Sequence, residues 1–175
     1  WLYRFNSLKP LEETEMTNVG PEIAQNKKLK TELEAGVFLV DRGLTDQAMK
    51  HFNAALAINR KIPDAHFLLA ECLRQQDNPK QAIKHYKKAI KLDPLLFEAQ
   101  FNLALILSST GDLNGAKISF RRALKIRPND PRSLELLGLL LMKTGSYEEG
   151  LGCVLKASGK IVFSIDPNTP LWIEN

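Results

Sequence analysis

Residues 63–96 read PDAHFLLAECLRQQDNPKQAIKHYKKAIKLDPLL, and residues 97–130 read FEAQFNLALILSSTGDLNGAKISFRRALKIRPND. The two stretches have the same length, 34 residues, and follow each other without an insertion. Their landmarks fall in register: Leu69, Ala70, Leu73, Ala82, Tyr86, Ala89 and Pro94 match Leu103, Ala104, Leu107, Ala116, Phe120, Ala123 and Pro128. A fixed period of this length is the sequence signature of a stacked repeat scaffold.

Each copy predicts two helices. Apolar residues recur every three to four positions, stop at a polar break and then resume. The break carries Asp77-Asn78 in one copy and Gly111-Asp112 in the next, and these residue types tolerate a left-handed backbone. The proline near the end of each copy lacks the amide hydrogen that a continuing helix needs. Helix caps are expected at Thr45, Asn78, Asp130 and Ser146.

The 34-residue spacing resembles the tetratricopeptide repeat family, whose signature places Leu-Gly, Ala, an aromatic residue, Ala and Pro at fixed intervals. The resemblance extends in both directions, through Gly36, Leu39, Gly43, Ala48, Phe52 and Ala55 before the quoted stretch and through Leu137, Gly138, Leu141 and Gly145 after it. It implies an all-α, right-handed α-solenoid of antiparallel helix pairs, with four repeats at residues 29–62, 63–96, 97–130 and 131–164. The second helix of repeat four is degenerate, because Gly150 and Gly152 each lower helix stability by about 0.5–1 kcal/mol relative to alanine.

The two ends do not follow the repeat. Residues 1–28 are expected to form an aromatic leader and an extension of the first helix, and residues 165–175 an apolar tail. With 44% hydrophobic and 25% charged residues, the chain is expected to form one structural domain. The leader either packs on repeat one, is a juxtamembrane stub, or inserts into a groove. The tail either packs on its own scaffold or binds a neighbouring copy or an absent domain.

Cysteine usage and hydropathy bear on the compartment. Cys72 and Cys153 occupy different repeat positions and indicate no disulfide framework, so a reducing, cytoplasmic compartment is favoured. The longest apolar run, residues 136–142, is too short to span a bilayer. The chain begins at Trp1 rather than at a methionine, so a longer, membrane-tethered parent protein stays open.

The first helices of the repeats carry more apolar residues than one packed face needs. The surplus residues are Leu33, Val37, Val40, Phe67, Phe101, Leu105, Leu139 and Met142. In the tetratricopeptide repeat family such a second stripe lines a concave groove, so the resemblance implies a partner-binding groove here. The same helices add the polar residues Asp64, Glu71, Arg74, Glu98, Asn102, Arg132, Glu135 and Lys143. A contiguous apolar groove usually marks a binding site, although packing within the stack is the alternative.

The residue types in this groove indicate the kind of partner. Asn102 lies in a Phe-Asn-Leu-Ala sequence similar to the family motif whose asparagine hydrogen-bonds a bound peptide backbone. The family's chaperone-tail receptors need lysine and asparagine where this chain has Leu33 and Val37, and these missing charge-assisted contacts argue against a carboxylate clamp. The expected partner is a protein segment, either an amphipathic helix or an extended apolar peptide. Phe101→Glu is then expected to abolish partner capture and to leave helicity intact.

The second helices of repeats two and three carry a basic outer face, made of Lys84, Lys87, Lys88, Lys91, Arg121, Arg122 and Lys125. The ordinary interpretation is a solvated surface. The alternative is attraction to an acidic protein, an anionic lipid or a nucleic acid. A net charge of only +4 and the absence of interleaved aromatic residues argue against sequence-specific nucleic-acid recognition.

The sequence shows no catalytic, cofactor-binding or metal-binding motif. His51 and His85 occupy equivalent positions in successive repeats, which predicts a column along the array rather than a shared ligand set, and His66 stands apart. We therefore expect a non-catalytic adaptor that binds a partner peptide or helix and needs no cofactor or metal. The alternatives are a self-assembling scaffold that uses its apolar termini, or the interaction arm of a larger enzyme.

Overall fold

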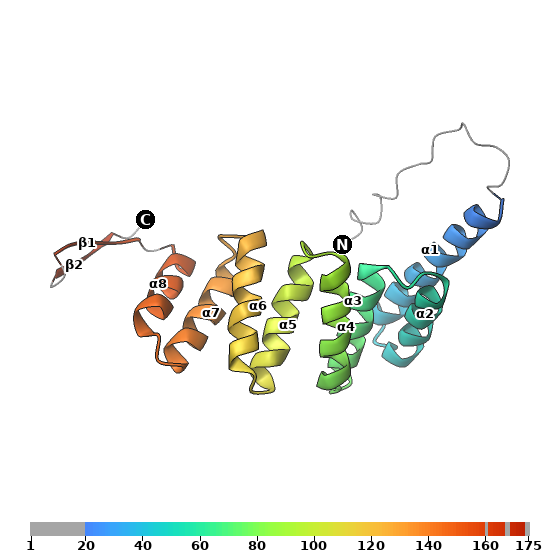
Figure 1. Ribbon diagram of the computed structural model, residues 1–175, viewed down its shortest axis with the longest axis horizontal. Coiled ribbons are helices and arrows are strands. Elements are labelled where there is room, and N and C mark those ends of the chain that lie inside the picture. The colour runs from blue at the N-terminus through green and yellow to red at the C-terminus, as the bar shows by residue number, and fades with distance from the viewer. Residues whose placement is uncertain (1–19, 160, 167–168, 174–175) are drawn as a thin grey trace.

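The computed structural model describes residues 20–159, 161–166 and 169–173. Within these ranges the helices are α1 (Gly20–Asp41), α2 (Thr45–Ile58), α3 (Pro63–Gln75), α4 (Pro79–Leu92), α5 (Phe97–Ser109), α6 (Leu113–Ile126), α7 (Pro131–Lys143) and α8 (Tyr147–Ala157). Figure 1 shows them as a row of helix pairs, from α1 and α2 at the right to α7 and α8 at the left. The aromatic leader lies outside the described residues.

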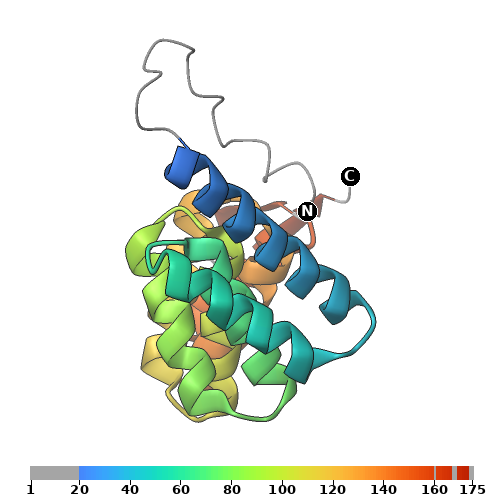
Figure 2. The same cartoon turned by 90° about the vertical axis from the view of Figure 1, so that its right-hand side faces the viewer.

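Packing between the helices follows the order of the chain. Helices α1 and α2, α3 and α4, α5 and α6, and α7 and α8 form close pairs, and the second helix of each pair also contacts the first helix of the next. Figure 2, viewed from the α1 end, shows the pairs stacked one behind another. The all-α solenoid of antiparallel helix pairs is therefore confirmed. The repeat boundaries given above stay a prediction.

The core is built from columns of equivalent residues. Ala48, Ala82 and Ala116 are fully buried, and so are Ala55, Ala89 and Ala123. Between these two columns of alanine lies a column of rings, Phe52, Tyr86 and Phe120, of which none is more than 1% exposed. Small residues let neighbouring helices approach, and the rings fill the remaining space. In α8, Gly150 is the buried residue and Val154 and Ala157 are only partly buried, so the last pair has a smaller core.

The turns inside the helix pairs share one backbone conformation. Gly43, Gly111 and Gly145 have φ of 73°, 88° and 89°, and Asp77 stands at the equivalent place with φ of 54°. The four positions are spaced by one repeat length, and each lies two residues after the last residue of a first helix. The predicted left-handed break at Asp77 and Gly111 is confirmed.

Two of the predicted caps are confirmed and two are wrong. The side chains of Asn78 and Asp130 accept hydrogen bonds from the backbone N–H groups of Gln81 and Ser133. Thr45 instead lies inside α2, and its hydroxyl hydrogen-bonds Gln75 of the next repeat at 3.2 Å. Ser146 stands at the N-cap of α8 without a side-chain cap hydrogen bond, so the predicted capping box is not formed.

The chain does not end as a plain apolar tail. Strands β1 (Ile161–Asp166) and β2 (Thr169–Ile173) form an antiparallel hairpin in which Ile161 pairs with Ile173 and Phe163 with Leu171. Apolar and β-branched residues favour extended backbone, which explains strands here. The hairpin begins within residues 131–164, the range predicted for repeat four. Figure 1 shows it projecting beyond α8.

Candidate binding site between helices α3, α5 and α7

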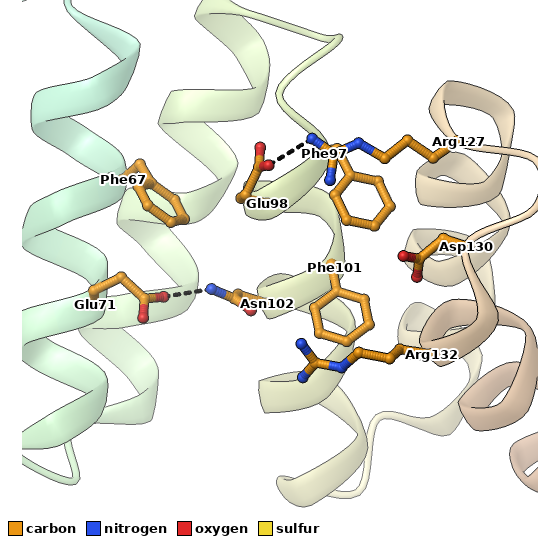
Figure 3. Close-up of a pocket in the computed structure, with 9 residues that line it drawn as sticks. All are labelled: Phe67, Glu71, Phe97, Glu98, Phe101, Asn102, Arg127, Asp130 and Arg132. Atoms are coloured by element: carbon orange, nitrogen blue, oxygen red, sulfur yellow. Dashed lines mark hydrogen bonds and ion pairs between the residues drawn. The ribbon is translucent and has the colours of Figure 1, made fainter. Parts of the chain in front are cut away.

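A hollow of about 330 Å³ lies where α3, α5 and the start of α7 come together. Its lining residues are Phe67, Glu71, Phe97, Glu98, Phe101, Asn102, Arg127, Asp130 and Arg132. Figure 3 shows these side chains reaching in from three consecutive repeats. The volume is near the lower end of the range for ligand pockets, and it fits one or a few side chains of a larger partner.

The floor of the hollow is aromatic, but its rings already serve the core. Phe67 is 2% exposed and Phe101 is 6% exposed. The Phe101 ring stacks on Phe97 with centroids 5.9 Å apart and meets Phe120 edge-on at 5.8 Å. The prediction that Phe67 and Phe101 are left unused by internal packing is therefore wrong. Phe101→Glu would bury a charge, so it would unfold the helix pair rather than block a surface.

One side of the hollow is held by a hydrogen-bond network centred on Glu71. The Asn102 side-chain amide donates to Glu71 Oε1 at 2.7 Å, and Arg74 donates to Oε2 at 3.0 Å. The Tyr86 hydroxyl also donates to Glu71. Burial, reinforced by the charge of Glu71, raises the pKa of Tyr86, so its phenol stays protonated and remains a donor.

The other side carries two guanidinium groups over aromatic rings. Arg127 lies 4.0 Å above the Phe97 ring and donates to Glu98 at 2.7 Å. Arg132 lies 4.9 Å from the Phe101 ring centroid, and both arginine side chains are largely exposed. Together with Asp130 these groups give the hollow a polar rim of both signs. Such a rim can bind polar backbone or charged side chains.

Six of the sixteen predicted groove residues line the hollow: Phe67, Glu71, Glu98, Phe101, Asn102 and Arg132. Three lining residues were missed. Phe97 is the first residue of α5, and Arg127 and Asp130 lie in the loop between α6 and α7. Helix periodicity points to residues along a helix face, so it gives no signal for residues at helix ends. A search of the loops that precede each first helix would have found Arg127 and Asp130.

The remaining predicted groove residues do not form a continuous apolar trough. Leu33 is buried, so the prediction that it lies open in the groove is wrong. Val37, Val40 and Leu105 are partly buried and pack against the core. Arg74 is exposed, Leu139 is 51% exposed and Met142 is partly buried, and none of the three lines the hollow. The first helices use most of their second apolar stripe in the core of the stack.

A histidine pair was also missed. His66 Nδ1 and His85 Nδ1 lie 3.2 Å apart, and His66 Nε2 donates to the carbonyl of Arg60 at 3.2 Å. Burial lowers the pKa of His66 and lowers that of His85 to about 4, so both rings are neutral near pH 7. The sequence placed His85 in a column with His51. In the structure His85 instead lies beside His66 of α3, the helix that packs directly against α4.

Cys72 is buried, Cys153 is partly buried, and neither forms a disulfide; burial raises the pKa of the Cys72 thiol to about 11. Among residues 20–159, 161–166 and 169–173, no cluster of three or more His, Cys, Asp and Glu side chains could hold a metal ion. No helix of that part of the chain combines the length and the hydropathy needed to cross a bilayer.

These features define a class: a helical-repeat scaffold whose described side chains converge on a hollow rather than on a catalytic group. Family models described as tetratricopeptide repeat match residues 63–94 and 97–130. The chain therefore contains tetratricopeptide repeats at residues 63–94 and 97–130. Repeats of this family typically form non-catalytic interaction modules, and a role in protein interaction or scaffolding follows.

Solved structures with the same fold include proteins named MamA. A crystal structure of MamA superposes with a TM-score of 0.72 at 23% identity, over 75% of this chain and 77% of that one. The structure titled MamA 41-end from Desulfovibrio magneticus RS-1 gives a TM-score of 0.70 at 20% identity, over 75% of each chain. At these identities the likeness shows the fold alone. No curated protein sequence matches the chain.

Proposed function

We propose that the chain is a non-catalytic adaptor that holds a segment of a partner protein in the hollow between α3, α5 and α7. The observation that carries the proposal is the convergence of Asn102, Arg127 and Arg132 above an aromatic floor. Amide and guanidinium donors at fixed positions can bind the carbonyl and carboxylate groups of an extended segment. A fixed rim also limits the entropy that binding would otherwise lose.

The partner segment is extended rather than helical. A helix would need a long apolar trough for its anchors at three- and four-residue spacing. Leu33 and Phe101 are buried in the core, so the first helices do not supply that trough. An extended segment leaves backbone carbonyls available for Asn102 and can place one side chain in the hollow.

A peptide library displayed on phage tests this function. We expect selected peptides to bind Asn102→Ala and Arg132→Ala about tenfold more weakly than the unchanged protein, since each substitution removes about 1–2 kcal/mol of contact. Helicity should not change in Arg132→Ala, because the Arg132 side chain is exposed. Binding constants would be measured by calorimetry.

Arg42 supplies a matched control. Its guanidinium lies 3.9 Å above the ring of Phe38, which is 53% exposed and distant from the hollow. Arg42→Ala removes the same kind of cation–π contact, and it should leave peptide binding unchanged. Equal losses in Arg42→Ala and Arg132→Ala, or a library that yields no binder, would place the function elsewhere.

A second candidate function is self-assembly through the C-terminal hairpin. Strands β1 and β2 pair only with each other in the described part of the chain, so each has one edge without a strand beside it. Such an edge can pair with a strand of another copy. Light scattering would show assembly that grows with concentration and disappears when the chain is ended after Gly159. A chain that is monomeric in both forms would rule this candidate out.

A further inference from the structure

The basic outer face lies on α4 and α6, opposite to the side by which these helices pack. In α4 the buried side is Ala82, Tyr86 and Ala89, and in α6 it is Ala116, Phe120 and Ala123. At 3.6 residues per turn, positions 84, 87, 88 and 91 project from the other side of α4, and positions 121, 122 and 125 do so in α6. All seven residues are exposed.

The charges of this face are scarcely neutralised. Neither α4 nor α6 contains an aspartate or a glutamate. Arg121 forms a salt bridge with Glu149 at 2.7 Å, whereas the other six residues form no salt bridge to any residue of the described ranges. The nearby histidines His66 and His85 add no negative charge. The face therefore presents a concentrated positive potential to solvent.

The face is confined to two repeats. Lys87, Lys88 and Lys91 stand at the same repeat positions as Arg121, Arg122 and Lys125. The equivalent positions hold Asn53, Ala54 and Ala57 in α2 and Leu155, Lys156 and Gly159 in or just after α8. Solubility alone does not explain why the basic residues occur in only two repeats, because α2 and α8 face solvent as well.

An aliphatic side chain lies in the middle of the charges. Ile118 occupies the α6 position equivalent to Lys84, one turn before Arg122, and is 51% exposed. At the border of the face, Leu92 is partly exposed one turn after Lys88. A bilayer surface offers negative charge and an apolar layer just beneath it. Nucleic acid offers the charge without that layer, and bases usually stack on aromatic side chains, which this face lacks.

We propose that the basic outer face binds the surface of a bilayer that contains anionic lipid. The lysine and arginine stems reach the headgroup phosphates while Ile118 enters the headgroup boundary. The hollow between α3, α5 and α7 lies on other helices and is left open. The interaction is therefore separate from partner binding and does not depend on it.

Sedimentation of the full chain with vesicles tests the proposal. We expect binding to phosphatidylcholine vesicles that contain phosphatidylserine and none to vesicles of phosphatidylcholine alone. Lys87→Gln/Lys88→Gln/Lys91→Gln should weaken binding ~100-fold, since each basic residue near an anionic surface contributes about 1 kcal/mol. Lys27→Gln/Lys28→Gln/Lys50→Gln removes the same charge from exposed positions of α1 and α2, and it should bind as well as the unchanged protein.

A second variant separates lipid from nucleic acid. Ile118→Ser should weaken vesicle binding about fivefold, because it removes an apolar side chain that becomes partly buried. It should not affect any residual affinity for random duplex DNA. Three results would each overturn the proposal. The first is an equal loss of vesicle binding in the two lysine triples, and the second is no binding to the anionic vesicles. The third is tighter binding to DNA than to vesicles, with no effect of Ile118→Ser. Arg132→Ala should bind vesicles normally whether or not the hollow binds peptides.

Discussion

Within the described ranges, Asp77 is the one non-glycine residue that has a positive backbone φ. The equivalent residue in the other three turns is glycine. A side chain in the left-handed region costs energy that glycine avoids, although aspartate tolerates it better than most residues. The sequence predicted this backbone from the residue type, because only a few residues are common in such turns.

Asp77→Gly is expected to raise the free energy of unfolding by about 0.5 kcal/mol. Relief of the left-handed strain exceeds the additional entropy that glycine gives to the unfolded chain. Urea denaturation measures the change as a higher midpoint at an unchanged slope. Gly111→Ala, the opposite exchange at the equivalent turn, should lower stability. A loss of stability in Asp77→Gly would mean that the Asp77 side chain stabilises the turn.

The His66–His85 pair makes stability depend on pH. The pKa of His85 is lowered to about 4, mainly by burial and then by His66, Lys88 and Lys84, while an unfolded histidine titrates near 6.5. Below pH 6.5 the unfolded chain therefore binds protons that the folded chain does not. Stability should be complete above pH 6.5 and should fall as the pH drops toward about 4.

His85→Gln should remove much of this loss, which we expect to be about 1 kcal/mol after allowance for the partial exposure of the ring. Thermal unfolding at pH 7 and at pH 5 would measure it. His51→Gln changes the histidine of α2 that pairs with Glu32 at 2.8 Å, and it should leave the contribution of His66 and His85 in place. An unchanged pH dependence in His85→Gln would contradict this explanation.

Among the elements, α7 and α8 pack backbone against backbone at two glycines. A Cβ atom added to Gly138 would lie 2.6 Å from the carbonyl oxygen of Gly150, and one added to Gly150 would lie 2.7 Å from the carbonyl oxygen of Gly138. Neither backbone can move without separating the pair. These two glycines therefore allow the close packing of the last two helices.

Gly138→Ala should destabilise the protein by about 2–3 kcal/mol, because overpacking against backbone cannot be relieved by a side-chain rotation. Gly152→Ala should stabilise it by about 0.5–1 kcal/mol, because the added methyl group meets open space and alanine favours helix. Chemical denaturation of the two variants measures both effects. If both substitutions changed the free energy of unfolding equally and in the same direction, helix propensity alone would explain their effects.

The sequence could not separate Gly150 from Gly152. Both were predicted to weaken the last helix for the same reason, since propensity depends only on residue type. The structure shows that Gly150 is buried against α7 and Gly152 is exposed. The packing of α8 on α7 decides which of the two glycines lies against the neighbouring helix. Residue type alone does not contain that information.

Across the whole molecule, burial decreases toward the end of the array. Helices α3 and α5 each have helices on both sides and eight buried residues, whereas α8 has one, Gly150. Repeat arrays are stabilised mainly by contacts between neighbouring repeats, so a terminal unit opens at a lower free energy.

Hydrogen exchange should therefore be fastest in α8 and slowest in α3 to α6. Mass spectrometry of peptides from each helix measures the order, and Gly152→Ala should slow exchange in α8 more than in α5. Uniform exchange rates in all helices would show that the array unfolds as a single cooperative unit.

The arrangement of helices and loops in the whole array decides how much of the candidate site the sequence could predict. Phe67, Glu71, Phe101 and Asn102 lie on first helices, where periodicity indicates the correct face. Arg127 and Asp130 lie in the loop after α6, and Arg127 contacts Phe97 and Glu98 at the start of α5. These contacts join residues far apart in the sequence, and helix periodicity does not indicate them. The polar rim was therefore predicted only in part.

The junction at Leu96 and Phe97 joins two copies with no residue between them, and Asp130 joins Pro131 in the same way. A gene segment that encodes residues 97–130 could be duplicated in frame, and each copy would keep one of its present neighbours and meet the other copy on its remaining side. The array would become longer by one repeat, and the repeats at its two ends would not change. Length is thus a property that this sequence can change by copying, without any new side chain.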